Sequence, residues 1–433
     1  MDFCLQEVKS NEDIEQLCSY LEKMSNENLS ELINSDNEIL FINFIKIAFV
    51  VFAQKNKRNY EVADKVIKDI ILNVNPWFTP YISDILCEFI QKPERAQKEY
   101  AYSVFKTLIE KNTKQITICM PKLVPFFSSD VNDVSSNVKI NCSECLELVL
   151  KCSGNADLDV FIPQVLKGLK DPSTIYDAVE ALASCVFVQN VESPALSITT
   201  PILLRGLNDK KTVTKRKTCV IINNMCELIE HPKEILPFYE RLKKLLEFSA
   251  DTISDPEARN ICGKALNTLK GSCSGNEDKV FEKTVDDFKN LIIEELKTHG
   301  SSISEDKLGS LLLTNMCNSN SFDKDVWKST LENYFVFENL SDEGREKLLE
   351  TIFDYGLKTF AVHEDIFEDT EEGKNLYQGS FSLAYGALTL LNNTHLHLKQ
   401  NRFYGLLGPN NCGKTTLMRA IANEQVEGFP KKD

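Results

Sequence analysis

Two stretches of the sequence, 162-IPQVLKGL-169 and 200-TPILLRGL-207, decide the fold. They place a proline second and a glycine seventh, and they lie 38 residues apart. Three further segments share the register: 79-TPYISDIL-86, 120-MPKLVPFF-127 and 236-LPFYERLKKLL-246. The spacings between the five prolines are 41, 42, 38 and 36 residues. Self-similarity at such a period is typical of a repeat architecture.

Each of the five segments has the apolar pattern of a helix. An apolar residue stands two positions after each proline and another five or six positions after it: Ile82, Leu123, Val165, Leu203 and Tyr239, then Leu86, Phe127, Leu169, Leu207 and Leu242. We expect the prolines in first helical turns, where the missing N–H has no partner. A second helical pattern follows most segments. A two-helix unit of about 40 residues indicates a HEAT-type α-solenoid; unrelated helices with similarly spaced prolines are the alternative.

Composition excludes several classes of protein. The 433 residues, 42% of them hydrophobic, predict a folded chain of two to three domains. No secretory signal opens the sequence, so we interpret the 14 cysteines as reduced thiols in the cytosol. Cys142 and Cys145 have metal-ligand spacing but no second pair to complete a site, which favours core cysteines. The longest apolar run, 39–53, contains Asn43 and Lys46 and is too short to cross a bilayer.

The net charge of -15 argues against nucleic-acid binding over the whole surface. One local exception is 209-DKKTVTKRKT-218, which carries five cations within eight residues: Lys210, Lys211, Lys215, Arg216 and Lys217. Such a run is typical of a solvated helix face, and it is also what a phosphate-binding patch requires. Both interpretations stay open at this point.

The pattern changes twice after the repeats. Helical segments over about 279–298, 303–317, 323–336 and 342–358 predict a four-helix bundle, or two degenerate repeats. An acidic run, 364–372, indicates a linker. Beyond it FSLAYG, THLHLK and RFYGLLG have the character of strands. We therefore expect a mainly α protein in four parts: a HEAT solenoid (1–275), a bundle (276–360), a linker (361–378) and an incomplete α/β domain (379–433).

The octapeptide 408-GPNNCGKT-415 fits G-x-x-x-x-G-K-[ST], the phosphate-binding loop. Backbone N–H groups and a following helix N-terminus form the anion site in such loops. Context supports the motif, because an apolar strand is predicted over 403–407 and a helix over 415–423. Asn411 stands where glycine is frequent and tolerates positive φ. The expected nucleotide contacts are Gly408, Asn410, Asn411, Cys412, Gly413, Lys414, Thr415 and Thr416, with the Thr415 hydroxyl on Mg²⁺ and Lys414 on the β/γ-phosphates.

The run 381–430, and above all TTLMRAIANEQVEGFP, resembles the start of the first ABC cassette of the elongation factor three family, ribosome-bound ATPases of the ABC-F class. That family has the same order of solenoid, bundle, acidic lead-in and cassette. The resemblance implies ATP-driven release of deacylated tRNA from the ribosomal E site, ribosome docking through solenoid and bundle, and Tyr385 as the adenine platform. Without the resemblance, Tyr385 is equally well an ordinary strand tyrosine.

The sequence departs from that family by lacking a signature segment, a second phosphate loop and a Walker B strand. We therefore expect no catalytic residue within the chain and no ATP turnover from residues 1–433 alone. The interpretation is the N-terminal part of an elongation-factor-three-like ATPase, cytoplasmic and monomeric. A non-catalytic scaffold with a vestigial loop, or another HEAT-bearing ABC-F translation factor, are the alternatives. Whether 433 is the natural end stays open.

Overall fold

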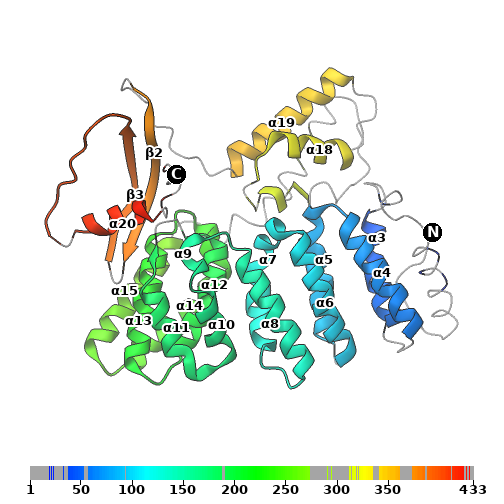
Figure 1. Cartoon of the computed structure of the whole chain (residues 1–433), viewed down its shortest axis with the longest axis horizontal. Helices are drawn as coiled ribbons and strands as arrows, with labels where there is room; N and C mark the ends of the chain where they lie inside the picture. The colour runs from blue at the N-terminus through cyan, green and yellow to red at the C-terminus, as the bar shows by residue number, and fades with distance from the viewer. Residues whose placement is uncertain are drawn as a thin grey trace. The chain divides into compact units, whose positions relative to one another are not determined.

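The computed structural model describes residues 38–52, 57–92, 94–187, 191–273, most of 312–334, 341–360, 373–385, 388–410 and 412–423, with a few isolated positions besides. The chain divides into two compact units. The first combines Met1–Cys119, Asp133–Leu148 and Phe281–His363, and the second combines Met120–Asn132, Val149–Val280 and Glu364–Asp433. Each unit is mainly helical, and the second also holds a sheet (Figure 1).

Each proline-bearing segment lies in a helix, and a second helix follows it along the chain. The first helices are α5 (Thr79–Ile90), α7 (Thr113–Asp130), α10 (Ile162–Lys170), α12 (Ser193–Leu207) and α14 (Pro232–Thr252). The second helices are α6 (Arg95–Lys111), α8 (Ser136–Lys151), α11 (Ile175–Ala183), α13 (Thr212–Glu227) and α15 (Pro256–Cys273). The predicted α-solenoid of two-helix repeats is confirmed.

The ten apolar residues of the repeat register are all buried, none of them more than 7% exposed. Burying one Leu or Ile side chain contributes about 1.5–3 kcal/mol to the free energy of folding. The register therefore marks the face by which each first helix packs into the core of the solenoid. This burial is the physical basis of the period that the sequence displays.

The expected position of the prolines is wrong for three of the five. Pro80 and Pro163 do lie in first turns, but Pro121, Pro201 and Pro237 lie inside α7, α12 and α14. An interior proline removes one backbone hydrogen bond and disturbs the carbonyl four residues before it. These helices begin earlier because their extra N-terminal turns bury apolar side chains, such as Leu196 and Ile198 of α12.

The two glycines of the repeat allow close approach between helices. A Cβ on Gly168 would lie 2.9 Å from Ala178 Cβ of α11 and 2.9 Å from Ile202 Cδ1 of α12. A Cβ on Gly206 would collide with Thr218 of α13. The glycine seventh in each segment is therefore the point where a first helix crosses its neighbours without room for a side chain.

An aspartate lies in the turn before the second helix of three repeats. Asp133, Asp171 and Asp209 lie 38 residues apart, and each accepts a backbone N–H two residues on: from Ser135 at 2.8 Å, Ser173 at 2.9 Å and Lys211 at 3.5 Å. Asp171 thereby caps the short η2 (Pro172–Thr174), which precedes α11, whereas α11 and α13 themselves begin without a side-chain cap. The turns of these three repeats thus share the same hydrogen bond between an aspartate and the backbone.

Polar contacts join equivalent helices of neighbouring repeats. In the first unit Lys98 of α6 donates to Asp133 at 2.7 Å, across 35 residues. In the second unit Lys264 of α15 pairs with Glu227 of α13 at 3.4 Å. The sequence separations match the repeat length, so these contacts are a property of the stacking. Partly exposed pairs of this kind each contribute no more than about 1 kcal/mol.

The first unit also holds α3 (Glu38–Phe52), α4 (Lys57–Asn73), the short η1 (Pro76–Phe78), α18 (Lys324–Tyr334) and α19 (Asp342–Phe360). The side chain of Trp327 in α18 is fully buried and stacks on Phe322, and it meets Phe353 of α19 edge-on. The two last helices of the predicted bundle are therefore present. The first predicted helix, 279–298, and most of the second lie outside the described residues, so the four-helix bundle stays a prediction.

The last part of the second unit begins with a β-hairpin. Strands β2 (Asn375–Tyr385) and β3 (Leu388–Lys399) pair antiparallel, and they confirm the strands expected at FSLAYG and THLHLK. A short strand from the solenoid, β1 (Val186–Phe187), extends this sheet by pairing antiparallel with Ala384 and Tyr385. Solenoid and hairpin thus share one three-stranded sheet within this unit.

The strand predicted over 403–407 is wrong. Residues 402–409 have no regular secondary structure, and the side chains of Phe403 and Leu407 are fully exposed or nearly so. An apolar run of this kind forms a strand only when neighbouring strands pair with it and cover both of its faces. No described strand pairs with it. The change from α to α/β is confirmed, but by a hairpin and one helix.

Most of the described cysteines are free thiols and are buried. Cys142 and Cys145 both lie in the core, as their interpretation as core residues predicts, and burial raises the pKa of the Cys145 thiol far above its usual range. Within the described part of the chain, none of the helices combines the length and apolar character needed to cross a membrane.

Candidate nucleotide-binding site

The phosphate-loop motif leads directly into a helix, as predicted. Helix α20 (Lys414–Ala422) begins one residue before the expected start, and its first hydrogen bond joins Leu417 N–H to Gly413 O at 2.9 Å. The N–H groups of the first turn of a helix have no partners within it and point outward along its axis. This end of α20 can therefore receive an anion.

Gly413 has two reasons to be glycine. Its φ of 90° is in the left-handed region, which disfavours any residue with a Cβ. A Cβ there would also lie 2.7 Å from Leu390 Cδ1 of β3. The loop therefore contacts the hairpin at Gly413, where the Leu390 side chain packs against it. Leu390 has no part in the motif, and sequence reasoning missed it because the contact is between residues far apart along the chain.

The Lys414 ammonium group is bent back over the loop. Its Nζ donates to Gly408 O at 2.7 Å and to Pro409 O at 2.6 Å, and it lies 3.8 Å from Cys412 Sγ. The lysine thus links the two ends of the loop. An incoming phosphate would take the ammonium group from two neutral carbonyls and give it a charged partner instead.

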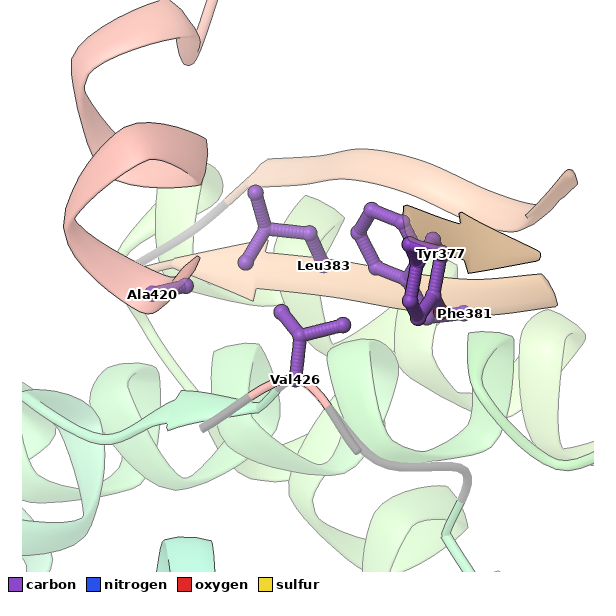
Figure 2. Packing of buried hydrophobic residues seen from close by; sticks show 5 residues of the cluster. All are labelled: Tyr377, Phe381, Leu383, Ala420 and Val426. Carbon is purple, nitrogen blue, oxygen red and sulfur yellow. The ribbon is translucent and has the colours of Figure 1, made fainter. Parts of the chain in front are cut away.

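Helix α20 is fixed on one face of the hairpin. Figure 2 shows Tyr377, Phe381 and Leu383 of β2 turned toward the same space as Ala420 of α20 and Val426. Residues 377, 381 and 383 lie on one face because side chains alternate along a strand. The Tyr377 ring stacks on Phe429, which follows the helix, with centroids 3.9 Å apart. This small core positions the N-terminus of α20 and hence the loop.

The remaining predicted nucleotide contacts are placed as follows. Asn410, Cys412 and Thr415 are exposed and Thr416 is half-buried, so all four are open to a ligand at the loop. Asn411 lies outside the described residues, and so does the side chain of Tyr385. The backbone of Tyr385 ends β2, paired with Leu388 and Val186.

The basic run 210–217 divides into two groups. Arg216 forms an ion pair with Glu257 of α15, and Lys217 forms one with Glu180 of α11. The hydrogen bond from Lys217 lowers the pKa of the Glu180 carboxyl. These two cations thus join three consecutive repeats. Their partners lie 41 and 37 residues away, so the local sequence gave no sign of them.

The other three cations of the run have different surroundings. Lys210 and Lys211 are exposed and Lys215 is half-buried. Lys211 Nζ lies 5.3 Å from the centre of the Tyr176 ring, a cation–π distance. Within the described residues, none of the three forms an ion pair with a carboxylate.

The loop is suited to bind a phosphate group, because Gly413 leaves the backbone open to it and Lys414 supplies a positive charge. For Mg²⁺ it offers the exposed Thr415 hydroxyl. Among the described residues, no group of three or more His, Cys, Asp or Glu side chains is arranged to hold a metal ion. A magnesium ion here would therefore depend on phosphate oxygens and water for most of its ligands, as is usual for this ion.

Models of known protein families match both the solenoid and the segment that contains the phosphate loop. The family model "EF3 N-terminal HEAT repeat" matches residues 5–146, and "Elongation factor 3/GNC1 HEAT repeat" matches 174–280. The model "ABC transporter" matches residues 391–428, which include the loop. The chain belongs to the elongation factor 3 family. Its HEAT repeats and the start of its ABC segment follow one another in this order.

Individual relatives extend this match over most of the chain. Elongation factor 3 of Gonapodya prolifera is 33% identical over 92% of this chain and 38% of its own length. Elongation factors 3A and 3B of Saccharomyces cerevisiae are 31% and 32% identical, over 88% and 86% of this chain and 37% and 36% of their own lengths. The chain thus spans less than two fifths of the length of these relatives.

Proposed function

We propose that this chain acts in translation elongation as part of a ribosome-associated, ATP-dependent factor. The observation that carries the proposal is the combination, in one chain, of elongation factor 3 HEAT repeats with a phosphate loop of the expected geometry. Loop and solenoid share a unit, in which β1 of the solenoid pairs with β2 of the hairpin. The relatives are named for elongation, and we extend that role to this chain.

In this proposal ATP and Mg²⁺ bind at the loop. The backbone N–H groups at the start of α20 and the Lys414 ammonium group hold the phosphates, and the Thr415 hydroxyl faces the metal ion. Tyr385 at the end of β2 supports the adenine. The nucleotide supplies the free energy that the complete factor uses to release deacylated tRNA from the E site. We expect no catalytic base among the residues of this chain.

The solenoid and the bundle supply the docking surface in this proposal. Solenoids present long surfaces to large partners, and a ribosome offers both RNA and protein. A ribosomal partner places the chain in the cytoplasm. The net charge of -15 is compatible with this, because phosphate contacts need only a local group of cations.

A second candidate is a docking scaffold whose loop has lost its nucleotide function. The observation that favours it is the extended apolar segment before the loop, with Leu407 92% exposed. A loop on such a segment has less support than a loop held by a sheet. The two candidates share ribosome docking and differ in nucleotide binding.

Nucleotide titration separates the candidates. A fluorescent ATP analogue with Mg²⁺ should bind the wild-type chain, and Lys414→Ala should weaken binding at least tenfold, since a charge-assisted contact contributes about 1.5–3 kcal/mol. Equal affinity of both proteins would favour the scaffold. We expect ATP turnover by the wild-type chain to equal that of the Lys414→Ala control, and hydrolysis that depends on Lys414 would contradict that expectation. Co-sedimentation with purified ribosomes tests the docking that both candidates require.

A further inference from the structure

A strand of the solenoid borders the position that the proposed function assigns to the adenine platform. In β1, which follows α11 along the chain, Val186 is paired with Tyr385, the last residue of β2. Phe187 is paired with Ala384, directly before it. On the other side of β2, Tyr385 is paired with Leu388 of β3. The backbone of Tyr385 therefore lies between two strands, one from the hairpin and one from the solenoid.

Contacts with the solenoid hold the chain on both sides of β1. Cys185, directly before the strand, is buried, and its Sγ donates to Asp157 O at 3.4 Å. The Phe187 side chain is buried as well. Val191, after the strand, is buried, and its N–H donates to Leu228 O, at the end of α13, at 3.1 Å. The position of β1 is therefore set by the helical repeats.

The phosphate end of the proposed nucleotide site has a different support. Gly413 of the loop contacts Leu390 of β3, and α20 packs on the hairpin through Ala420. Both contacts are made within the last part of the second unit. The loop is thus held by the hairpin, whereas the end of β2 is also held by a solenoid strand. A change in β1 should therefore affect the binding of the base more than the binding of the phosphates.

We propose that β1 positions the adenine platform: the strand holds position 385 at the end of β2, and Phe187 anchors the strand in the solenoid. An isolated pair of strands is only marginally stable, so a third strand adds order to the end of the hairpin. This proposal rests on the nucleotide binding proposed above and gives the solenoid a part in it. Phe187 is a positioning residue, because it acts on the nucleotide through the backbone of β2.

The same pairing couples the nucleotide to the solenoid. If the pairing of β1 with β2 raises the affinity for the base, a bound base stabilises the pairing by the same factor, because coupling between two sites is reciprocal. The bound base thereby acts on the helices on either side of β1, which are α11 and α12. A nucleotide that lacks the base, or a free phosphate chain, should leave this pairing unchanged.

Four single variants of the 433-residue chain test the proposal. Phe187→Ala removes the ring that anchors β1, and Phe187→Leu keeps an apolar side chain there. Val186→Gly weakens the preference for extended backbone and retains the Phe187 ring, so it provides the test if Phe187→Ala does not fold. Phe238→Ala is the matched control, because it truncates a ring of similar burial in α14. Circular dichroism spectra and thermal melts establish that each variant is folded.

The measurement is calorimetric titration with Mg-ATP and with magnesium tripolyphosphate, which has the phosphate chain without adenosine. Tyr385→Ala calibrates the contribution of the base, since stacking of a base on an aromatic ring raises affinity about fivefold or more. Phe187→Ala and Val186→Gly should lose a comparable part of the affinity for ATP and keep the wild-type affinity for tripolyphosphate. Phe187→Leu and Phe238→Ala should retain both affinities. Equal weakening of both ligands by Phe187→Ala, or the same loss in Phe238→Ala, overturns the positioning role.

Two further measurements address the path from β1 to the base. The double variant Phe187→Ala/Tyr385→Ala should bind ATP no more weakly than Tyr385→Ala alone, because both changes act on one contact. Additive losses overturn the proposal. Hydrogen–deuterium exchange of the β1 amides in the wild-type chain should slow with saturating Mg-ATP and stay unchanged with saturating magnesium tripolyphosphate. Equal exchange with both ligands contradicts the coupling.

The two ligands also separate failure of this proposal from failure of the proposed function. If the wild-type chain and Tyr385→Ala both bind ATP and tripolyphosphate equally well, the phosphate loop functions and the role of β1 in positioning the adenine platform is wrong. If the wild-type chain binds neither ligand, nucleotide binding itself is wrong, and the role of β1 is overturned with it.

Discussion

Apolar side chains are buried in the solenoid but exposed in the segment before the phosphate loop. The ten register residues of the repeats are buried, whereas Phe403 and Leu407 project into solvent. Both regions have apolar runs of similar strength in the sequence. The difference lies in the partners: the repeat helices within each unit pack against neighbouring helices, and residues 403–407 have no described strand beside them. Hydrophobicity alone therefore predicts burial only where the fold supplies a second surface.

The largest effect should come from matched phenylalanine truncations. Phe238 of α14 is 1% exposed, and Phe238→Ala should lower the free energy of unfolding by about 3–5 kcal/mol, because it removes buried atoms and leaves a cavity. Phe403→Ala, a chemically identical change at an exposed site, should alter it by less than about 0.5 kcal/mol. Urea unfolding monitored by circular dichroism measures both. Comparable losses in the two variants would contradict the contrast between the regions.

The next effect concerns the backbone of the loop. Gly413→Ala forces a Cβ into a left-handed conformation and against Leu390, at a cost of about 1–3 kcal/mol. Affinity for a fluorescent ATP analogue should fall by about tenfold or more. Gly405→Ala is the control, because a Cβ there meets nothing within 4 Å. If the control loses as much affinity as Gly413→Ala, the loop is not the determinant that the geometry indicates.

A smaller effect concerns Asp133, in the turn before α8. Hydrogen bonds from the Lys98 ammonium group and from Ser135 N–H lower the pKa of Asp133. Its stabilising contribution is therefore fully present above the unfolded pKa of about 3.9, and it is lost as pH falls through the lower folded value. After discounting for solvent exposure we expect about 1 kcal/mol or less.

Thermal melts of wild type and Asp133→Asn, at neutral pH and at steps below pH 4, measure this contribution. The variant should be slightly less stable at neutral pH, and the difference should shrink as the acid range is entered. Asp130→Asn, at the end of α7, provides a comparison. If the stability difference between wild type and Asp133→Asn grew as the pH fell, the Asp133 carboxylate would not be the stabilising group.

Sequence reasoning succeeded where the determining contacts recur. The proline register predicted five repeats and all ten of their buried side chains, because the same positions of each first helix face the core. The aspartates at 133, 171 and 209 also indicate the repeat, because their spacing of 38 residues equals that of the glycine-bearing segments. Sequence reasoning overlooked them. A search for recurring turn residues would have found them.

Sequence reasoning failed where the decisive partner lies far away and does not recur. Pro201 resembles a helix start, but the apolar residues before it extend α12 toward its N-terminus. Residues 403–407 have strand character, yet pairing depends on other strands. Arg216 belongs to a basic run, and only the fold shows Glu257 beside it. At the loop the motif predicted the helix that follows it, and the nucleotide contacts of its residues stay predictions.

Hydrogen–deuterium exchange of the 433-residue chain tests the central contrast most directly. The account predicts that amides in the middle of α12, α13 and α14 exchange slowly, close to the rate set by global unfolding. Amides of residues 403–407 should exchange nearly as fast as in an unstructured peptide, and Mg-ATP should slow exchange at 408–416. Strong protection of 403–407 in the absence of nucleotide, equal to that of the solenoid helices, would contradict it.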